Sequence, residues 1–134
     1  MPIEVYFTGG RKVNAKIGSF DIATDQSVSA GGEGSAPEPF ALFLASLATC
    51  AGIYVKSFCD QRQIAADKIT LTMDYGYDPL TKLIDRIWIK INVPADFPEK
   101  YDSAVINAAE LCKVKRHLKE SIEIKVTVSR FAAE

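Results

Sequence analysis

The stretch Pro39-Phe-Ala-Leu-Phe-Leu-Ala-Ser-Leu-Ala-Thr-Cys-Ala-Gly-Ile-Tyr-Val55 is the most apolar part of the chain, and it decides the fold. Within and just after it, large side chains recur at intervals of three and four residues, which places them on one face of a helix. The side chains that share this face are Phe43, Leu47, Cys50, Tyr54 and Phe58. We predict one long helix from Pro39 to about Arg62. At about 1.5 Å per residue it spans roughly 35 Å and forms the central element of the fold.

Alternating apolar residues on both sides of this helix predict strands. The segments with this pattern are Ile3–Phe7, Val13–Ile17, Phe20–Ile22, Ile69–Tyr75, Ile87–Val93 and Ile122–Val128. Asp96-Phe-Pro-Glu99 is typical of a helix start, and a short helix is expected between Lys113 and Glu120. The buried stripe of the helix that starts near Asp96 is predicted to be Ala104, Val105, Ala108 and Leu111. Strands grouped apart from helices indicate an α+β fold with antiparallel sheets.

Size and charge limit the class of protein. With 134 residues, of which 48% are hydrophobic and 25% charged, the chain is expected to form a single domain over residues 1–134. A net charge of −1 gives no reason to expect nucleic acid or a membrane as partner. Residues Met1 to Val5 lack the basic and apolar regions of a signal peptide, so a cytoplasmic protein is expected.

The chain has three cysteines and one histidine, without a Cys-x-x-Cys pair or the ligand spacing of a zinc site. No metal or cofactor is therefore expected, and the thiols are either buried small hydrophobes or chemically active. Cys50 lies in the predicted core helix, where these two interpretations are about equal. Cys112 is followed by a basic cluster, which favours a thiolate or simply forms a solvated face. Cys59 falls on the opposite helix face from Cys50, and we interpret it as structural.

These residues carry a resemblance to a known family. The helix from Pro39 to Cys50 and the following Ala51-Gly52-Ile53 resemble the central helix of the OsmC/Ohr family. Cys112, with Val114 and Leu118 after it, resembles the second cysteine motif of that family, in which Cys-Pro-Val is common. The predicted element order is similar to the family fold over essentially the whole chain. The resemblance implies an OsmC-like fold, with antiparallel sheets packed around the long helix in an intertwined homodimer.

The resemblance also implies an activity, that of a thiol-dependent organic hydroperoxide reductase. Cys50 would be the peroxidatic thiol, whose thiolate attacks the terminal peroxide oxygen and becomes a sulfenic acid while the alcohol leaves. Cys112 would be the resolving thiol, which condenses with the sulfenic acid to give a disulfide and water. An external dithiol reductant would then restore both thiols by exchange. The resemblance implies organic hydroperoxides as the preferred substrates, and the large apolar side chains near Cys50 would accommodate an organic tail.

The sequence departs from the family pattern at the acidic position. The characterised peroxidases also use an arginine, which stabilises the thiolate, and a glutamate that holds the arginine. That glutamate follows the proline equivalent to Pro39, where this chain has Phe40, and other branches carry it one position later, where this chain has Ala41. Glu38 is the nearest carboxylate, and we predict that it caps the helix. Arg11, after Gly9-Gly10, is the candidate arginine.

Two other classes of function are considered. The missing carboxylate favours a non-peroxidase OsmC-like protein that binds a small apolar or sulfur-containing ligand at the dimer interface, or relays sulfur through Cys50. The segment Gly31-Gly-Glu-Gly34 matches the Gly-x-x-Gly loop of nucleic-acid-binding KH domains. Glu33 gives this loop the wrong charge for phosphate, and the loop follows a predicted strand, so nucleic-acid binding is not expected.

Overall fold

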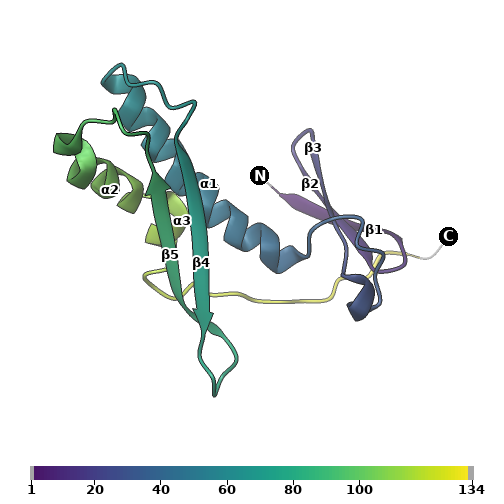
Figure 1. Ribbon diagram of the computed structural model, residues 1–134. Helices are drawn as coiled ribbons and strands as arrows, with labels where there is room; N and C mark the ends of the chain where they lie inside the picture. The colour runs from purple at the N-terminus through teal and green to yellow at the C-terminus, as the bar shows by residue number, and fades with distance from the viewer. Residues whose placement is uncertain (1, 133–134) are drawn as a thin grey trace. The chain divides into compact units, whose positions relative to one another are not determined.

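The computed structural model describes residues 2–132, and Figure 1 shows its helices and strands. The strands are β1 (Ile3–Gly9), β2 (Lys12–Ile17), β3 (Phe20–Thr24), β4 (Thr70–Tyr77) and β5 (Ile84–Asn92). The helices are α1 (Pro39–Gln61), α2 (Asp102–Glu110) and α3 (Lys113–His117), with 3-10 turns η1 (Val28–Ala30) and η2 (Glu99–Tyr101). The predicted α+β class, with antiparallel sheets and one long helix, is confirmed.

The described chain divides into two compact units. The first contains the residues up to 49 together with 71–90, and the second contains 50–70 together with the residues from 91 onward. Helix α1 runs through the boundary between Thr49 and Cys50. By length and composition alone this helix is long and apolar enough to cross a membrane, a test that the core helix of a soluble protein also passes.

The first unit carries a three-stranded antiparallel sheet in the order β1-β2-β3. Ile3 pairs with Ile17, and Ile17 pairs in turn with Phe20, so the three strands form a simple meander. In the β1–β2 turn, Gly9 and Gly10 have φ values of 117° and 57°. Residues that carry a Cβ rarely adopt such values. The three predicted N-terminal strands are therefore confirmed, with ends that differ by a few residues.

Strands β4 and β5 form a hairpin sheet of the same unit. The carboxylate of Asp78 accepts hydrogen bonds from the backbone N–H groups of Leu80 and Thr81 at 2.7 and 3.0 Å. The N–H of Asp78 also donates to the carbonyl of Leu83 at 2.8 Å, which closes the turn. An aspartate that binds the backbone two residues ahead is a common way to fix a turn. These hydrogen bonds of Asp78 fix the turn between β4 and β5.

A buried carboxylate organises the loop between β3 and α1. Asp25 is 1% exposed, and its two oxygens accept hydrogen bonds from the backbone N–H groups of Gln26, Glu33 and Ser35 and from the Ser35 hydroxyl. Gly32 fits against this centre, because a Cβ there would overlap the Gln26 carbonyl and the Asp25 carboxylate. The hydrogen bond from the Ser35 hydroxyl is the largest cause that lowers the Asp25 pKa, to about 2.

We expect Asp25→Asn to lower the midpoint of thermal unfolding at pH 7 by several degrees. The folded protein holds the pKa of Asp25 at about 2, below its ordinary value of 3.8. Its contribution to stability is therefore present above pH 4 and is lost as the pH falls towards 2. Circular dichroism melts at pH 7 and pH 2.5 check this, with Asp74→Asn on the exposed surface of β4 as control. Equal melts of Asp25→Asn and wild type at pH 7 would contradict the assignment.

The second unit is held together by apolar side chains from the C-terminal half of α1 and from the segment after β5. Its most buried apolar residues are Ala51, Val55, Phe58, Cys59, Phe97, Val105 and Cys112. The ring of Phe58 meets the ring of Tyr101 edge to face at 5.8 Å, which joins α1 to η2. The guanidinium of Arg62 lies 3.7 Å from the centre of the Phe58 ring and covers it. Such contacts stabilise aromatic pairs beyond the burial of their area.

Two sequence predictions in this unit need correction. The helix expected from Asp96 begins later, because η2 starts at Glu99 and α2 at Asp102. Its predicted buried stripe is wrong at Leu111, which follows the last turn of α2 and is 55% exposed. The stripe is confirmed at Val105, which is 3% exposed. Pro98 precedes η2 with an extended backbone, and this delays the start of the helix.

The predicted last strand is also wrong. The segment 121–132 belongs to no strand in the part of the chain that the structure describes. Its alternating apolar side chains, Ile122, Ile124, Val126 and Val128, are 61–90% exposed. A β-strand is defined by backbone hydrogen bonds to a neighbouring strand. None of the five described strands pairs with this segment. The period-2 pattern is present, but within the described residues the segment pairs with no strand.

Candidate functional site

Two of the three predicted site residues lie together in the second unit. Cys50 occupies α1 and is half-buried, whereas Cys112 is 1% exposed and stands immediately before α3. Their thiols are hydrogen-bonded to each other. The α1 periodicity and the short α3 therefore bring two cysteines from distant parts of the sequence into direct contact.

The surroundings of Cys50 favour its thiolate. The backbone N–H of Val114, at the start of α3, lowers the pKa of the Cys50 thiol most strongly. The Cys112 side chain, the N–H of Lys113 and the charge of Arg116 also lower this pKa, against the opposing effect of burial. Backbone N–H groups and a nearby cation are the groups that stabilise a thiolate in reactive cysteines.

The surroundings of Cys112 favour its neutral thiol. Burial is the largest cause that raises the pKa of Cys112, and its hydrogen bond with Cys50 raises it further. The charge of an ionised Cys50 also raises the pKa of Cys112, because ionisation of one of two neighbouring thiols disfavours ionisation of the other. The lowered pKa of Cys50 and the raised pKa of Cys112 make Cys50 the thiol of the two that ionises more readily. A contacting pair with pKa values pushed apart is the arrangement expected of groups with different chemical roles.

The side chains of the basic cluster after Cys112 contact different partners. Lys115 forms an ion pair with Glu110, and the His117 ring bonds the Lys113 carbonyl at 2.7 Å. Arg116 instead donates from Nη2 to the Tyr54 hydroxyl at 3.5 Å. The basic cluster is recognisable in the sequence, but the contact between Arg116 and Tyr54 is not. Sequence spacing could have indicated both residues. Tyr54 follows Cys50 by four positions, and Arg116 follows Cys112 by four, so each lies on the same helical face as its cysteine.

Cys59 has the environment of a structural residue. It is fully buried in the second unit, and burial raises the pKa of its thiol. A buried neutral thiol packs as a small hydrophobe and reacts slowly. These properties match the prediction that Cys59 is a bystander.

Arg11, the third predicted site residue, lies in the first unit. It is exposed at the turn between β1 and β2, and its Nε is close to Gly31. The thiol pair belongs to the second unit, so a catalytic role of Arg11 stays a prediction.

At the start of α1, apolar residues occupy the positions where the family has its glutamate. Phe40 is 51% exposed and stacks on Phe43 at a centroid distance of 5.5 Å. Glu38 precedes the helix, as predicted, but its carboxylate accepts a hydrogen bond from the Ser27 N–H at 3.3 Å. This partner of the Glu38 carboxylate lies just before η1, whereas the Glu38 carbonyl accepts the N–H of Ala41 at 3.0 Å. In both family positions for the glutamate, 40 and 41, the structure has an apolar side chain.

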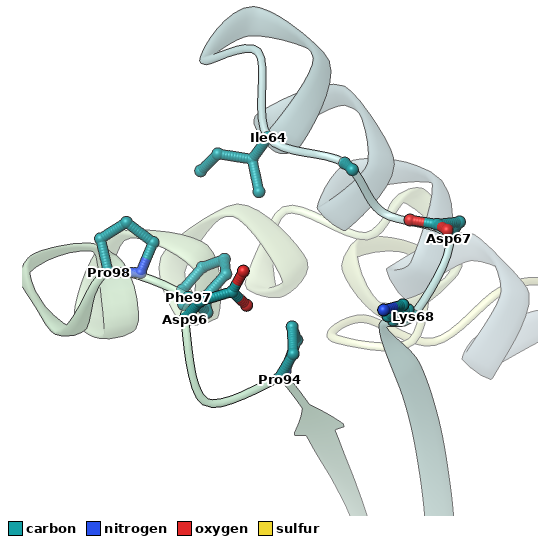
Figure 2. A pocket seen from close by; sticks show the side chains of 8 residues that line it. Ile64, Asp67, Lys68, Pro94, Asp96, Phe97 and Pro98 are labelled. Carbon is teal, nitrogen blue, oxygen red and sulfur yellow. The ribbon is translucent and has the colours of Figure 1, made fainter.

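The second unit also contains a pocket of about 470 Å³, shown in Figure 2. Its lining residues are Ile64, Ala65, Asp67, Lys68, Pro94, Asp96, Phe97 and Pro98. They follow the C-terminal end of α1 and of β5, and they include neither cysteine of the contacting pair. Among the described residues, no group of three or more His, Cys, Asp or Glu side chains is placed to hold a metal ion.

The family of the chain follows from comparison with known proteins. The family model of OsmC-like proteins matches residues 32–127, which include both cysteines of the contacting pair. The chain belongs to the OsmC-like protein family. No curated relative matches it in sequence.

Solved structures of OsmC-like proteins have the same fold. An OsmC-like protein from Mycoplasma pneumoniae is 15% identical with a TM-score of 0.70, over 88% of this chain and 86% of the other. The organic hydroperoxide resistance protein OsmC from Legionella pneumophila is 17% identical with a TM-score of 0.59, over 88% of each chain. The organic hydroperoxide resistance protein OhrB of Bacillus subtilis is 21% identical with a TM-score of 0.55, over 93% of this chain and 96% of the other. At these identities the likeness establishes the fold.

Proposed function

We propose that this OsmC-like protein is a thiol-dependent organic hydroperoxide reductase with Cys50 as the peroxidatic and Cys112 as the resolving thiol. The observation that carries the proposal is the contact between these thiols, with the pKa of Cys50 lowered and that of Cys112 raised. A thiolate is the nucleophile in peroxide reduction, and a neighbouring thiol is needed to trap the sulfenic acid. Two similar structures carry the name organic hydroperoxide resistance protein, which supports this class of substrate.

The proposed reaction balances in three steps. The Cys50 thiolate attacks the terminal oxygen of the hydroperoxide, the O–O bond breaks, and the alkoxide takes up a proton and leaves as the alcohol. Cys112 then attacks the Cys50 sulfenic acid, which forms the disulfide and releases water. An external dithiol reduces the disulfide by two exchange steps and is itself oxidised. Cytoplasmic location, where such dithiols are kept reduced, is part of the proposal.

The reaction rate of the reduced protein tests this function. Stopped-flow measurement with an alkyl hydroperoxide at pH 7 should give a second-order rate constant far above that of free cysteine under the same conditions. The same measurement with hydrogen peroxide should give a smaller constant. A rate no higher than that of free cysteine would refute the peroxidase function.

A homodimer is part of the proposal. The apolar side chains of the segment 121–132 lie on an extended chain and are largely exposed, as Ile124 and Val126 show at 82% and 90%. These apolar side chains would be removed from water if the segment paired with a strand of a second copy of the chain. We expect a mass in solution of twice 14.7 kDa, measured by light scattering after gel filtration. A monomer at micromolar concentration would contradict this assignment.

A second function is favoured by Phe40 and Ala41, which stand where peroxidases of the family have a carboxylate. Under this alternative, the protein binds a small apolar or sulfur-containing ligand, or carries sulfur on Cys50. Native mass spectrometry of freshly purified protein distinguishes the two functions. A bound ligand or a persulfide on Cys50 supports the alternative, and their absence counts against it.

A further inference from the structure

Two residue pairs form successive contacts between α1 and α3. Cys50 and Tyr54 are four residues apart on α1, and Cys112 and Arg116 are four residues apart at the start of α3. This spacing places the members of each pair on the same face of their helix. The thiols contact each other, and Arg116 donates to the Tyr54 hydroxyl at 3.5 Å. The N–H of Arg116 also bonds the Cys112 carbonyl at 3.0 Å, so the turn that carries the guanidinium is fixed to the cysteine.

We propose that Arg116, positioned by Tyr54, is the cation that stabilises the Cys50 thiolate in this chain. The inference deepens the proposed function, on which its catalytic part rests. In this arrangement Arg116 provides the guanidinium and Tyr54 holds it in place. This matters because Phe40 and Ala41 stand where peroxidases of the family have the carboxylate that holds their arginine. The phenol takes the place of that carboxylate as the hydrogen-bond acceptor for the arginine.

The neighbouring charges leave Arg116 as the best placed cation. Lys115 is paired with Glu110, and the His117 ring is bonded to the carbonyl of Lys113. Two side chains, Cys112 and Arg116, both from the 112–116 segment, act on the ionisation of Cys50. From α1, the Tyr54 phenol contacts this segment through Arg116. A planar guanidinium can bind the phenol through one nitrogen and keep its other donors towards an anionic sulfur or a peroxide oxygen.

The pH profile of Cys50 alkylation tests the inference without using a peroxide. The protein is treated with iodoacetamide between pH 5 and 10, and the modified Cys50 peptide is quantified by mass spectrometry. In Arg116→Gln we expect the profile to move to higher pH and the rate at pH 7 to fall on the order of threefold, as for loss of one partly exposed charge pair. Lys115→Gln is the matched control, because it removes the same charge from the same short helix, and the Lys115 side chain is paired with Glu110. It should leave the profile close to that of wild type.

Two further variants separate charge from position. Arg116→Lys keeps the charge and should retain most of the low-pH reactivity of Cys50. Tyr54→Phe keeps the ring and removes the acceptor, so it should move the profile in the same direction as Arg116→Gln but by less. Since Tyr54→Phe leaves α3 unaltered, it also tests the inference if Arg116→Gln fails to fold.

The outcomes separate this inference from the proposed function. An unchanged profile in Arg116→Gln, or an equal shift in Lys115→Gln, would overturn the role of Arg116 even if the wild-type protein reduces hydroperoxides. A shift specific to Arg116→Gln would support the role even if wild type proved inert to hydroperoxides, and only the peroxidase proposal would then fall.

Discussion

Replacing Cys50 with serine is expected to lower the rate of organic hydroperoxide reduction by at least about 1,000-fold, because it removes the nucleophile. A serine hydroxyl is not ionised at neutral pH, and the N–H groups of Val114 and Lys113 that favour a thiolate cannot make it a comparable nucleophile. The rate is measured as peroxide consumed under turnover with an excess of a dithiol. Serine is close to cysteine in size, so the second unit should keep its packing.

Cys59 provides the matched control for this substitution. It lies on the same helix, but it is fully buried and its pKa is raised. We expect Cys59→Ser to keep the wild-type rate in whatever fraction of the protein folds, which circular dichroism quantifies. Substantial activity in Cys50→Ser, or its loss in folded Cys59→Ser, would show that the reactive thiol has been assigned wrongly.

Replacing Cys112 with serine is expected to change the product of the reaction. The first oxidation of Cys50 does not need the Cys112 sulfur as nucleophile, so single-turnover loss of peroxide should persist. No disulfide can form within the chain, and Cys50 should stop as a sulfenic acid that dimedone traps. Excess peroxide should then convert it to the sulfinic acid, which a dithiol does not reduce.

The readout for Cys112→Ser is the intact mass after one and after ten equivalents of hydroperoxide. We expect the addition of one oxygen atom in the first case and of two in the second, with both located on Cys50. Wild type treated in the same way should resist the second addition, because the disulfide protects Cys50. If Cys112→Ser turned over with a dithiol as fast as wild type, Cys112 would not be the resolving thiol.

Most of the fold is predictable from residue periodicity. Apolar residues at helical spacing from Phe43 to Phe58 place the ends of α1 to within a residue or two. Alternation identifies the five described strands, because side-chain period separates strands from helices in a short chain. The segment Ile122–Val128 shows the limit of this method. Its alternation is as regular as that of β5, but pairing depends on a neighbour that the alternation does not specify.

The site is predictable in part. The helical face of Cys50 and the basic cluster after Cys112 single out the two thiols that the structure brings together, and the rotation of Cys59 away from Cys50 predicts its different surroundings. Which side chain of the basic cluster contacts which partner depends on how α1 and α3 pack in three dimensions. The local sequence pattern does not specify that packing. This is why Arg11 drew attention in the sequence and Arg116 did not, although the charge of Arg116 is among the causes that lower the pKa of Cys50.

The most direct test of the account is the intact mass of the fully reduced wild-type protein after one equivalent of an organic hydroperoxide, followed by peptide mapping. Contact between Cys50 and Cys112 predicts rapid loss of two hydrogens per chain and a cross-linked pair of peptides that contain these two cysteines. Unreacted thiols, or slow oxidation distributed over Cys50, Cys59 and Cys112, would contradict a two-thiol peroxidase.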